Sequence, residues 1–333
     1  MLKKIKNISK SRKKIIFSIA TVLFIGLMLS SILLACANTQ IASVGDNSSS
    51  SNEKAGTTET DISLASIEDA IYIDDTSSNN WQWAKSVGIC TGSGTYDDPY
   101  VIQFKFINGD NLQSWESCIE IKNSYKHFKI TSCVLSNSKW AGIELINTKN
   151  GDITGNLLNG NKYGVWIRYS DCGFWHSSNW ISDNIFANNE FGICLEESKY
   201  NIISNNDGRL NRNGIKLISS NDNWISNNDF SYEYTGSYGI LLSNSHNNYI
   251  HDNDNNNLIY GIYLVYSDNN EISANTVNED SFGIYLKESD YNQISGNKVT
   301  NNWFGIYLMY SNYNTVSGNI FSGNIIIDFF KYP

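Results

Sequence analysis

The stretch from Gly283 to Phe304 reads GIYLKESDYNQISGNKVTNNWF, and a near copy, GIYLMYSNYNTVSGNIFSGN, follows directly from Gly305. Successive copies begin at Gly239, Gly261, Gly283 and Gly305, so the repeat is 22 residues long. A fixed period of this length is typical of solenoids, in which each repeat forms one rung. The period therefore decides the fold class.

Each copy carries the pattern of three short strands. Phe304, Ile306 and Leu308 occupy alternate positions, and this alternation predicts a strand with one face turned inward. Two further strands are expected around Val316 and Phe321, separated by Ser, Asn and Gly residues that favour turns. Such strands bury their inward faces only by stacking rung on rung, and parallel crossovers are overwhelmingly right-handed. The sequence therefore predicts an all-β fold, a single-stranded right-handed parallel β-helix of about nine to ten coils of ~22 residues.

The irregular spacings support this prediction. Earlier copies begin at Gly142, Gly164, Gly192 and Gly214, and the spacing rises to 28 residues after Gly164 and to 25 residues after Gly214. The additional residues fall at expected turns and leave the strands intact, which is how a solenoid accommodates insertions.

Three columns of residues recur at fixed places in the repeat. An asparagine column predicts an amide ladder in which each side chain bonds to its neighbours above and below. A serine column has the same structural interpretation, and the aromatic residue before each glycine is expected to point inward and stack in the core. The asparagines are Asn156, Asn184, Asn206, Asn228, Asn253, Asn275, Asn297 and Asn319; the serines are Ser198, Ser220, Ser245, Ser267, Ser289 and Ser311; the aromatic residues are Tyr163, Phe191, Tyr238, Tyr260, Phe282 and Phe304.

The N-terminus is interpreted as a targeting segment. Seven Lys or Arg residues precede an apolar run from Ile15 to Leu34, and this order is typical of export signals. Residues 33–36 (LLAC) resemble a bacterial lipobox, in which Cys36 is lipidated after removal of residues 1–35. An uncleaved membrane helix and plain secretion are the alternatives. All three place the rest of the chain outside the cytoplasm, and the first two hold it at the outer side of the membrane.

The net charge bears on the partner. The chain carries a formal net charge of −9, and loss of the seven basic residues in the acid-free segment 1–35 makes it −16. Nucleic-acid binding needs basic surface, so nucleic acid is not an expected partner.

The rest of the chain divides into three parts. Residues 37–66 are rich in Ser and Thr and too polar to fold, which predicts a disordered tether. Residues 67–106 lack the repeat and are expected to form an N-terminal cap, with Trp81 and Trp83 covering the open end of the first coil. Residues 107–333 form the predicted β-helix.

The motifs resemble a known family. The opening GSGTYDDPYVI (Gly92–Ile102), followed by repeats of the form GI-x-L and S-x-x-N-x-I-S-x-N, resembles β-helix proteins of the NosD type, over Gly92 to Gly323. These carry the carbohydrate-binding and sugar-hydrolase type of repeat, also described as pectin-lyase-like. The resemblance implies the fold. Its namesake is a periplasmic copper-binding protein, which implies a role as an accessory protein for copper delivery.

Copper sites need clustered His, Cys or Met, whereas the four histidines of this chain are scattered. Cys172 and His176, in the six-residue insertion, form the one pairing to consider, and an ordinary loop is the favoured interpretation. No cofactor is expected.

Function in a packed β-helix must lie on outward positions. Glu144, Trp166, Arg168, Glu196 and Lys216 are expected on one sheet near the insertion. An aromatic platform with flanking carboxylates, or a Lys/Arg pair, suits polysaccharide hydrolysis or β-elimination. Hydrolysis needs carboxylates about 5–5.5 or 6.5–9.5 Å apart. Glu144 and Glu196 are two coils apart, roughly 9–10 Å. The favoured alternative is a surface ion pair of Arg168 with Glu196, beside an exposed Trp166.

A second set of outward residues is aromatic. Tyr263, Tyr285 and Tyr307 occupy one position in three successive copies, so their rings are expected to stack every ~4.8 Å. Such a column stabilises a sheet and also offers a flat amphipathic surface to a glycan or protein.

Three functions remain open from these residues. The preferred one is an extracytoplasmic, membrane-tethered module that binds carbohydrate or another cell-surface component, without demonstrable catalysis. The alternatives are a polysaccharide hydrolase or lyase using the Glu144 to Lys216 face, and a NosD-like copper-delivery accessory.

Overall fold

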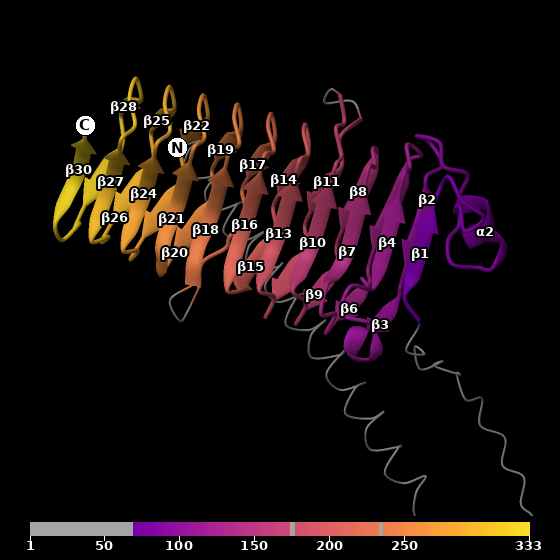
Figure 1. The fold of residues 1–333 in the computed structure, drawn as a ribbon. Coiled ribbons are helices and arrows are strands. Elements are labelled where there is room, and N and C mark those ends of the chain that lie inside the picture. The colour runs from indigo at the N-terminus through magenta and orange to yellow at the C-terminus, as the bar shows by residue number, and fades with distance from the viewer. Residues whose placement is uncertain (1–68, 174–176, 233–235) are drawn as a thin grey trace, which may run out of the picture. The chain divides into compact units, whose positions relative to one another are not determined.

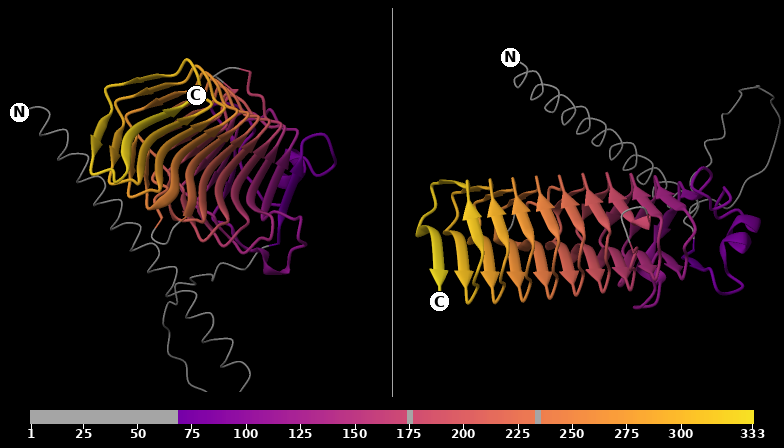
Figure 2. Two further views of the ribbon diagram at one scale, coloured as in Figure 1. Left: turned by 60° about the vertical axis from the view of Figure 1, so that its left-hand side comes forward. Right: turned by 90° about the horizontal axis from the view of Figure 1, so that it is seen from above.

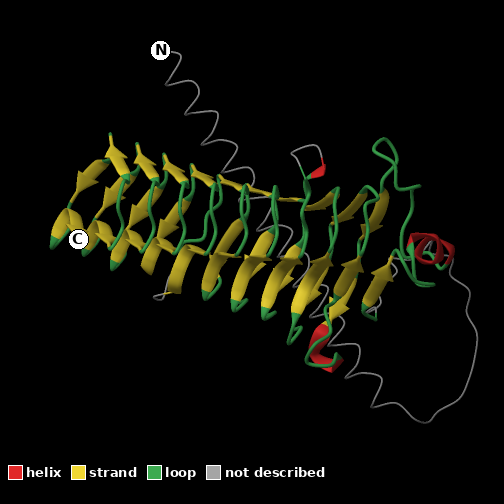
Figure 3. Cartoon of the chain, turned by 45° about the horizontal axis from the view of Figure 1, so that its top comes forward, coloured by secondary structure: helices red, strands yellow, loops and turns green. Residues whose placement is uncertain are grey.

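The computed structural model describes residues 69–173, 177–232 and 236–333. The predicted signal segment, Cys36, the tether and His176 therefore lie outside the described residues. The described chain is all-β, with parallel strands stacked rung on rung along one axis (Figure 1). Figure 2 shows the successive rungs from two further sides, and Figure 3 shows that strands make up most of each rung and loops its corners. The predicted parallel β-solenoid is confirmed.

The first strand of each rung belongs to an 11-stranded sheet, called sheet A. Its members are β1 (Ile71–Asp74), β4 (Ile119–Lys122), β7 (Ala141–Ile146), β10 (Tyr163–Arg168), β13 (Phe191–Glu196), β16 (Asn213–Ile218), β18 (Gly236–Ser243), β21 (Leu258–Val265), β24 (Phe282–Lys287), β27 (Phe304–Met309) and β30 (Ile327–Tyr332).

The second strand of each rung belongs to a 10-stranded sheet, called sheet B. Its members are β2 (Tyr100–Gln103), β5 (Phe128–Thr131), β8 (Gly151–Thr154), β11 (Trp180–Ser182), β14 (Ile202–Ser204), β17 (Trp224–Ser226), β19 (Tyr249–His251), β22 (Glu271–Ser273), β25 (Gln293–Ser295) and β28 (Thr315–Ser317).

The third strands form sheets of five and four strands, joined through isolated bridges of Asp229 to Asp207 and Asp254. The larger contains β3 (Phe106–Asn108), β6 (Val134–Ser136), β9 (Leu157–Asn159), β12 (Ile185–Ala187) and β15 (Asp207–Leu210). The smaller contains β20 (Asp254–Asn256), β23 (Thr276–Asn278), β26 (Lys298–Thr300) and β29 (Ile320–Ser322).

Stacked aliphatic side chains fill the interior. Leu264 pairs in register with Leu286, and Leu286 pairs with Leu308. All three are at most 1% exposed. Each rung thus buries the face that its own short strands cannot bury, which is the physical reason for the 22-residue register.

The N-terminal boundary differs from the prediction. β1, β2 and β3 already pair with the next rung, so residues 71–108 form a complete first coil rather than a separate cap. The covering element is α2 (Trp81–Ser86), between β1 and β2 at the indigo end of Figure 1. Trp81 is buried there, stacked on Tyr100 with ring centroids 4.8 Å apart. A short helix η1 (Gly109–Asn111) follows β3.

The expected asparagine ladder is present. Asn206 Nδ2 donates to Asn228 Oδ1 at 2.9 Å, and Asn228 Nδ2 donates to Asn253 Oδ1 at 3.0 Å. In the serine column, each backbone N–H donates to the next serine oxygen, as from Ser220 to Ser245. A further amide ladder, absent from the sequence predictions, runs through Asn179, Asn201, Asn223, Asn248 and Asn270. These ladders satisfy buried backbone groups at the corners.

The aromatic residues before each glycine do not point inward, contrary to the prediction. In β24, Phe282 is half-buried, Gly283 and Ile284 are both buried, and Tyr285 is again half-buried. Strict alternation therefore breaks at the glycine, because two consecutive residues face the interior. Phe282 and Tyr285 consequently share the outer face, with ring centroids 5.2 Å apart.

Asp280 is an acidic residue in a third column, in which Asn302 and Asn324 occupy the next two rungs. It is 1% exposed, and its backbone N–H donates to Asn302 Oδ1. One carboxyl oxygen accepts from the Leu258 N–H at 2.8 Å, whereas the other is buried with no hydrogen-bond partner in the described part of the chain. Burial raises the pKa of Asp280 well above its ordinary value.

We expect Asp280→Asn to raise the free energy of unfolding at pH 7 by about 1–3 kcal/mol, because the amide removes the cost of ionising a buried carboxyl group. An acid whose pKa is raised by folding stabilises the fold while protonated. Wild-type stability from this group is therefore present below the unfolded pKa near 4 and is lost as pH rises through the folded pKa. Thermal unfolding from pH 4 to 8 should show the gain of Asp280→Asn growing with pH. The exposed Asp97→Asn is the control, and a variant less stable than wild type at pH 7 would contradict the argument.

Candidate functional site

Glu144 in β7 belongs to a closed polar network. Its side chain is 1% exposed, and Arg168 Nη2 lies 2.5 Å from Oε1. Ser117 Oγ donates to Oε2 at 2.8 Å, and Trp140 Nε1 donates to Oε1 at 3.4 Å. A carboxylate held by three donors and removed from solvent is committed to structure. It does not face a position that a substrate could occupy.

A second acid lies one rung before it. Glu120 pairs in register with Glu144 and forms an ion pair with Lys122. Burial raises the pKa of Glu120, Lys122 opposes this shift, and the neighbouring Glu144 adds to it. Each acid is therefore paired with its own cation: Glu120 with Lys122, and Glu144 with Arg168.

The expected Arg168–Glu196 ion pair is not formed. The two residues are in register, but the Arg168 guanidinium is directed to Glu144 and lies 4.4 Å from the Trp166 ring centre. Arg168 pairs with Glu144 because an unpaired carboxylate costs more free energy when it is fully buried than when it is half-buried, as Glu196 is. The catalytic candidates Glu144, Arg168 and Glu196 therefore do not assemble into an open acid pair.

Trp166 and Lys216 also differ from expectation. Trp166 is 7% exposed, packed with Ala141 and Cys194 rather than forming an exposed platform. The Lys216 ammonium lies over the Phe191 ring, 5.2 Å from its centre. The outer face of sheet A from β10 to β16 therefore exposes less aromatic and charged surface to a ligand than the outward pattern predicted.

Tyr263, Tyr285 and Tyr307 occupy adjacent rungs of sheet A, as predicted. The first two rings are stacked with centroids 5.1 Å apart, and the next pair meets edge to face at 5.4 Å. With the neighbouring Tyr260, Phe282, Phe304 and Phe330 they form one aromatic surface, called the tyrosine face. Burial and the adjacent tyrosines raise the pKa of Tyr285 to about 12. All three tyrosines remain half-buried.

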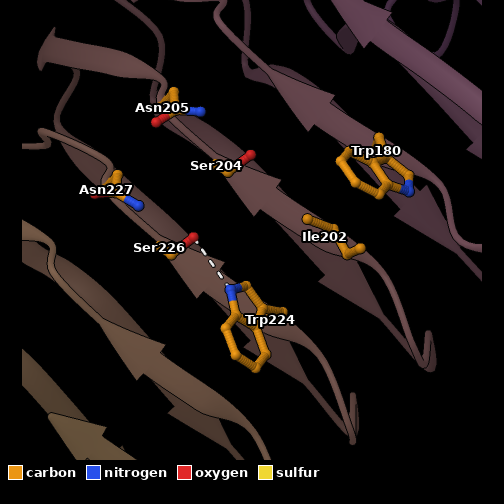
Figure 4. Close-up of a pocket in the computed structure, with 7 residues that line it drawn as sticks. All are labelled: Trp180, Ile202, Ser204, Asn205, Trp224, Ser226 and Asn227. Atoms are coloured by element: carbon orange, nitrogen blue, oxygen red, sulfur yellow. Dashed lines mark hydrogen bonds between the residues drawn. The ribbon is translucent and has the colours of Figure 1, made fainter. Parts of the chain in front are cut away.

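Sheet B carries a hollow that the sequence analysis did not identify (Figure 4). Trp180 in β11, Ile202 in β14 and Trp224 in β17 lie in register on three successive rungs and form its floor. Polar groups from the ends of β14 and β17 complete it, namely Ser204, Asn205, Ser226 and Asn227. Its volume is about 360 Å³, within the usual range for small-ligand pockets. These seven residues are called the indole hollow.

The two indoles of the hollow differ in how they are held. Trp224 Nε1 donates to Ser226 Oγ at 3.2 Å, and its ring stacks on Tyr249 with centroids 5.3 Å apart. His251 meets the same ring edge-on at 4.6 Å. Trp180 is 48% exposed. Trp224 is therefore preorganised by its neighbours, whereas Trp180 presents a large open apolar surface.

The signal for this hollow is present in the sequence. The variable position of the Asn-x-Ile pattern is the outward residue before each buried isoleucine of sheet B. It reads Trp180, Ile202, Trp224 and Tyr249 in consecutive coils. The outward positions of sheet A, which supplied the predicted candidates, do not contain this signal, so the hollow was not predicted.

No group of three or more metal-ligating side chains lies together in residues 69–173, 177–232 and 236–333. Cys172 is buried, and its sulfur lies 3.6 Å from Asn179 Nδ2 and 3.6 Å from Asn201 Oδ1. It is thus part of an amide ladder. Cys90, Cys118 and Cys194 are likewise buried free thiols, and Cys133 is also buried. The same ranges contain no helix with the length and apolar character needed to cross a membrane.

Comparisons with solved structures find distant likenesses. The periplasmic alginate epimerase AlgG is 14% identical over 68% of this chain and 84% of its own, with a TM-score of 0.42. The Dettilon tailspike protein is 17% identical over 66% of this chain and 47% of its own, with a TM-score of 0.48. DFA-IIIase from Arthrobacter chlorophenolicus A6 is 13% identical over 59% and 54%, with a TM-score of 0.45. Likenesses this distant do not indicate what this chain binds.

No curated protein matches the chain significantly. Family descriptions do match. "Right handed beta helix region" covers residues 117–277, and "Periplasmic copper-binding protein (NosD)" covers residues 234–327. Both fall on the rungs described above, and together they support a NosD-type right-handed β-helix repeat protein.

Proposed function

We propose that this protein is an extracytoplasmic module that binds carbohydrate on the outer surface of its β-helix, without catalysing a reaction. The indole hollow is the observation that carries the proposal. The tyrosine face is a second surface of suitable chemistry, with its rings already engaged in stacking on one another.

The chemistry of the hollow matches that of a sugar. A pyranose presents apolar C–H groups on its faces and hydroxyl groups around its edge. Trp180, Ile202 and Trp224 supply apolar contact, and tryptophan gives large contact area at low entropic cost. Ser204 and the carboxamides of Asn205 and Asn227 supply donors and acceptors at the border of the same hollow. A shallow aromatic floor with a polar border suits a ring with both characters.

The location outside the cytoplasm rests on two supports. The basic and apolar order of residues 1–34 is that of an export signal, and the matching NosD family is described as periplasmic. We propose tethering to the outer side of the membrane, through lipidated Cys36 or an uncleaved helix.

The two alternative functions receive no support of this kind. Glu144 is buried against Arg168, which removes it from a hydrolase or lyase site. For copper delivery, the described residues offer no cluster of ligands.

We expect Trp180→Ala to weaken binding of a matched oligosaccharide by about tenfold or more, because truncating a central aromatic contact commonly costs at least ~1.4 kcal/mol. A glycan array would first identify the oligosaccharide, and calorimetric titration of the full-length chain would then measure affinity. Trp303→Ala is the matched control, since Trp303 is 58% exposed and lies outside the hollow. Equal affinity of the Trp180→Ala variant and wild type would refute the role of the hollow.

A further inference from the structure

The surface around the indole hollow is acidic. Asp183 follows β11 directly, is exposed, and lies one rung from the hollow residue Asn205 because β11 and β14 are in register. Asp252 follows β19 at the corresponding place, and Glu271 succeeds Tyr249 in the outward column. Carboxylates thus lie at both ends of the row formed by Trp180, Ile202, Trp224 and Tyr249.

Among the described residues, the lysines nearest the hollow are paired with carboxylates. Lys129 lies 2.9 Å from Asp152, and Lys199, before β14, lies 4.0 Å from Asp171. The outward positions of β11, β14, β17, β19 and β22 contain no Lys or Arg. Recognition of a carboxylate or sulfate group relies on such cations, so the hollow has no unpaired basic side chain beside it on these strands.

The polar groups that the hollow does offer are uncharged. Ser182, Ser204 and Ser226 form a row of hydroxyls beside the indole row, at the next outward position of each strand. Ser182 Oγ is 3.4 Å from Thr154 Oγ1, so this row extends to the preceding rung. Hydroxyl and carboxamide groups both donate and accept, which matches sugar hydroxyls and gives no advantage to an anion.

We infer that the indole hollow selects uncharged glycans and rejects uronate-containing ones, and that Asp183 is the residue that determines this specificity. The inference rests on the proposed function and assigns it a ligand class. The indoles and hydroxyls bind any pyranose of suitable shape. The Asp183 carboxylate then repels a sugar carboxylate placed one rung away, where exposed charges still interact appreciably at low ionic strength.

The test compares two oligosaccharide classes on the full-length chain. The probes are uncharged gluco-, manno- and xylo-oligosaccharides and oligogalacturonates of equal length, titrated at low and at high salt. We expect the uncharged class to contain the tightest ligand and the oligogalacturonates to bind at least about tenfold more weakly at low salt. The difference should narrow at high salt, because screening weakens repulsion between exposed charges.

Asp183→Asn is the decisive variant. Asp183 has a φ of 57°, a conformation that asparagine also tolerates, so the fold is preserved. The variant should bind oligogalacturonate several-fold more tightly than wild type and the uncharged ligand equally well. Asp97→Asn removes the same charge from an exposed site outside the hollow and should change neither.

The outcomes separate the two claims. Oligogalacturonate binding as tight as that of the uncharged class, unchanged by Asp183→Asn, overturns this inference and leaves carbohydrate binding intact. Failure of every probe to bind overturns the proposed function, and this inference with it.

Discussion

Asn228→Ala is expected to lower the free energy of unfolding by roughly 2–4 kcal/mol, through the loss of buried hydrogen bonds. Asn228 is 1% exposed. Its Oδ1 accepts from both the backbone N–H and Nδ2 of Asn206, and its Nδ2 donates to Asn253 Oδ1 and the Ile203 carbonyl. Alanine leaves the Asn206 backbone N–H buried without its acceptor. It also removes the side-chain bonds by which residue 228 links this rung to those on either side.

Because Asn228 lies near the middle of the β-helix, its substitution should change the shape of the thermal unfolding transition as well as its midpoint temperature. The stability of a solenoid is approximately a sum of rung and interface terms, so a break in the ladder near its middle weakens the coupling between the two halves. Thermal unfolding followed by circular dichroism should show a lowered and broadened transition. Limited proteolysis should cut near residue 228 before it cuts elsewhere in the β-helix.

Gln293→Ala is the control for Asn228→Ala. Gln293 lies in β25 and is exposed on the outer face of sheet B, where substitutions usually change stability by no more than about 0.5 kcal/mol. If Asn228→Ala unfolds as cooperatively and at the same temperature as this control, the ladder does not hold the rungs together.

The fold was predictable because its determinants repeat. An inward isoleucine or leucine recurs at one place in every coil, and the parallel register follows from the period alone. The amide ladder was predictable for the same reason, since Asn206, Asn228 and Asn253 recur three residues after a buried isoleucine. Repetition in sequence becomes adjacency in space, and this needs no knowledge of side-chain orientation.

Departures from regular geometry were not predictable in this way. The outward position of Phe282 follows from two consecutive inward residues at Gly283 and Ile284, which a rule of strict alternation cannot express. The partner of Arg168 depended on the burial of Glu144, whereas register alone favours Glu196. The apolar residues of the indole hollow also recur at one outward position, but that position lies on sheet B, whereas the predicted catalytic and binding candidates all lie on sheet A.

Arg168→Ala is expected to lower the free energy of unfolding by about 3–5 kcal/mol, because removing one partner of a buried ion pair leaves the other uncompensated. Glu144 would keep the donors Ser117 and Trp140 and lose its cation. Arg209→Ala is the matched control. Arg209 pairs with Asp207 at 2.6 Å while 58% exposed, and exposed pairs contribute about 0–1 kcal/mol.

The double variant Glu144→Gln with Arg168→Ala tests the cause of this loss. If the damage comes from an uncompensated carboxylate, removing its charge should recover a substantial part of the stability lost in Arg168→Ala. A loss of stability caused by missing packing over Trp166 would instead persist in the double variant, because the contact between Arg168 and Trp166 does not involve Glu144. A small effect of Arg168→Ala, equal to that of Arg209→Ala, would mean that Glu144 does not need its cation.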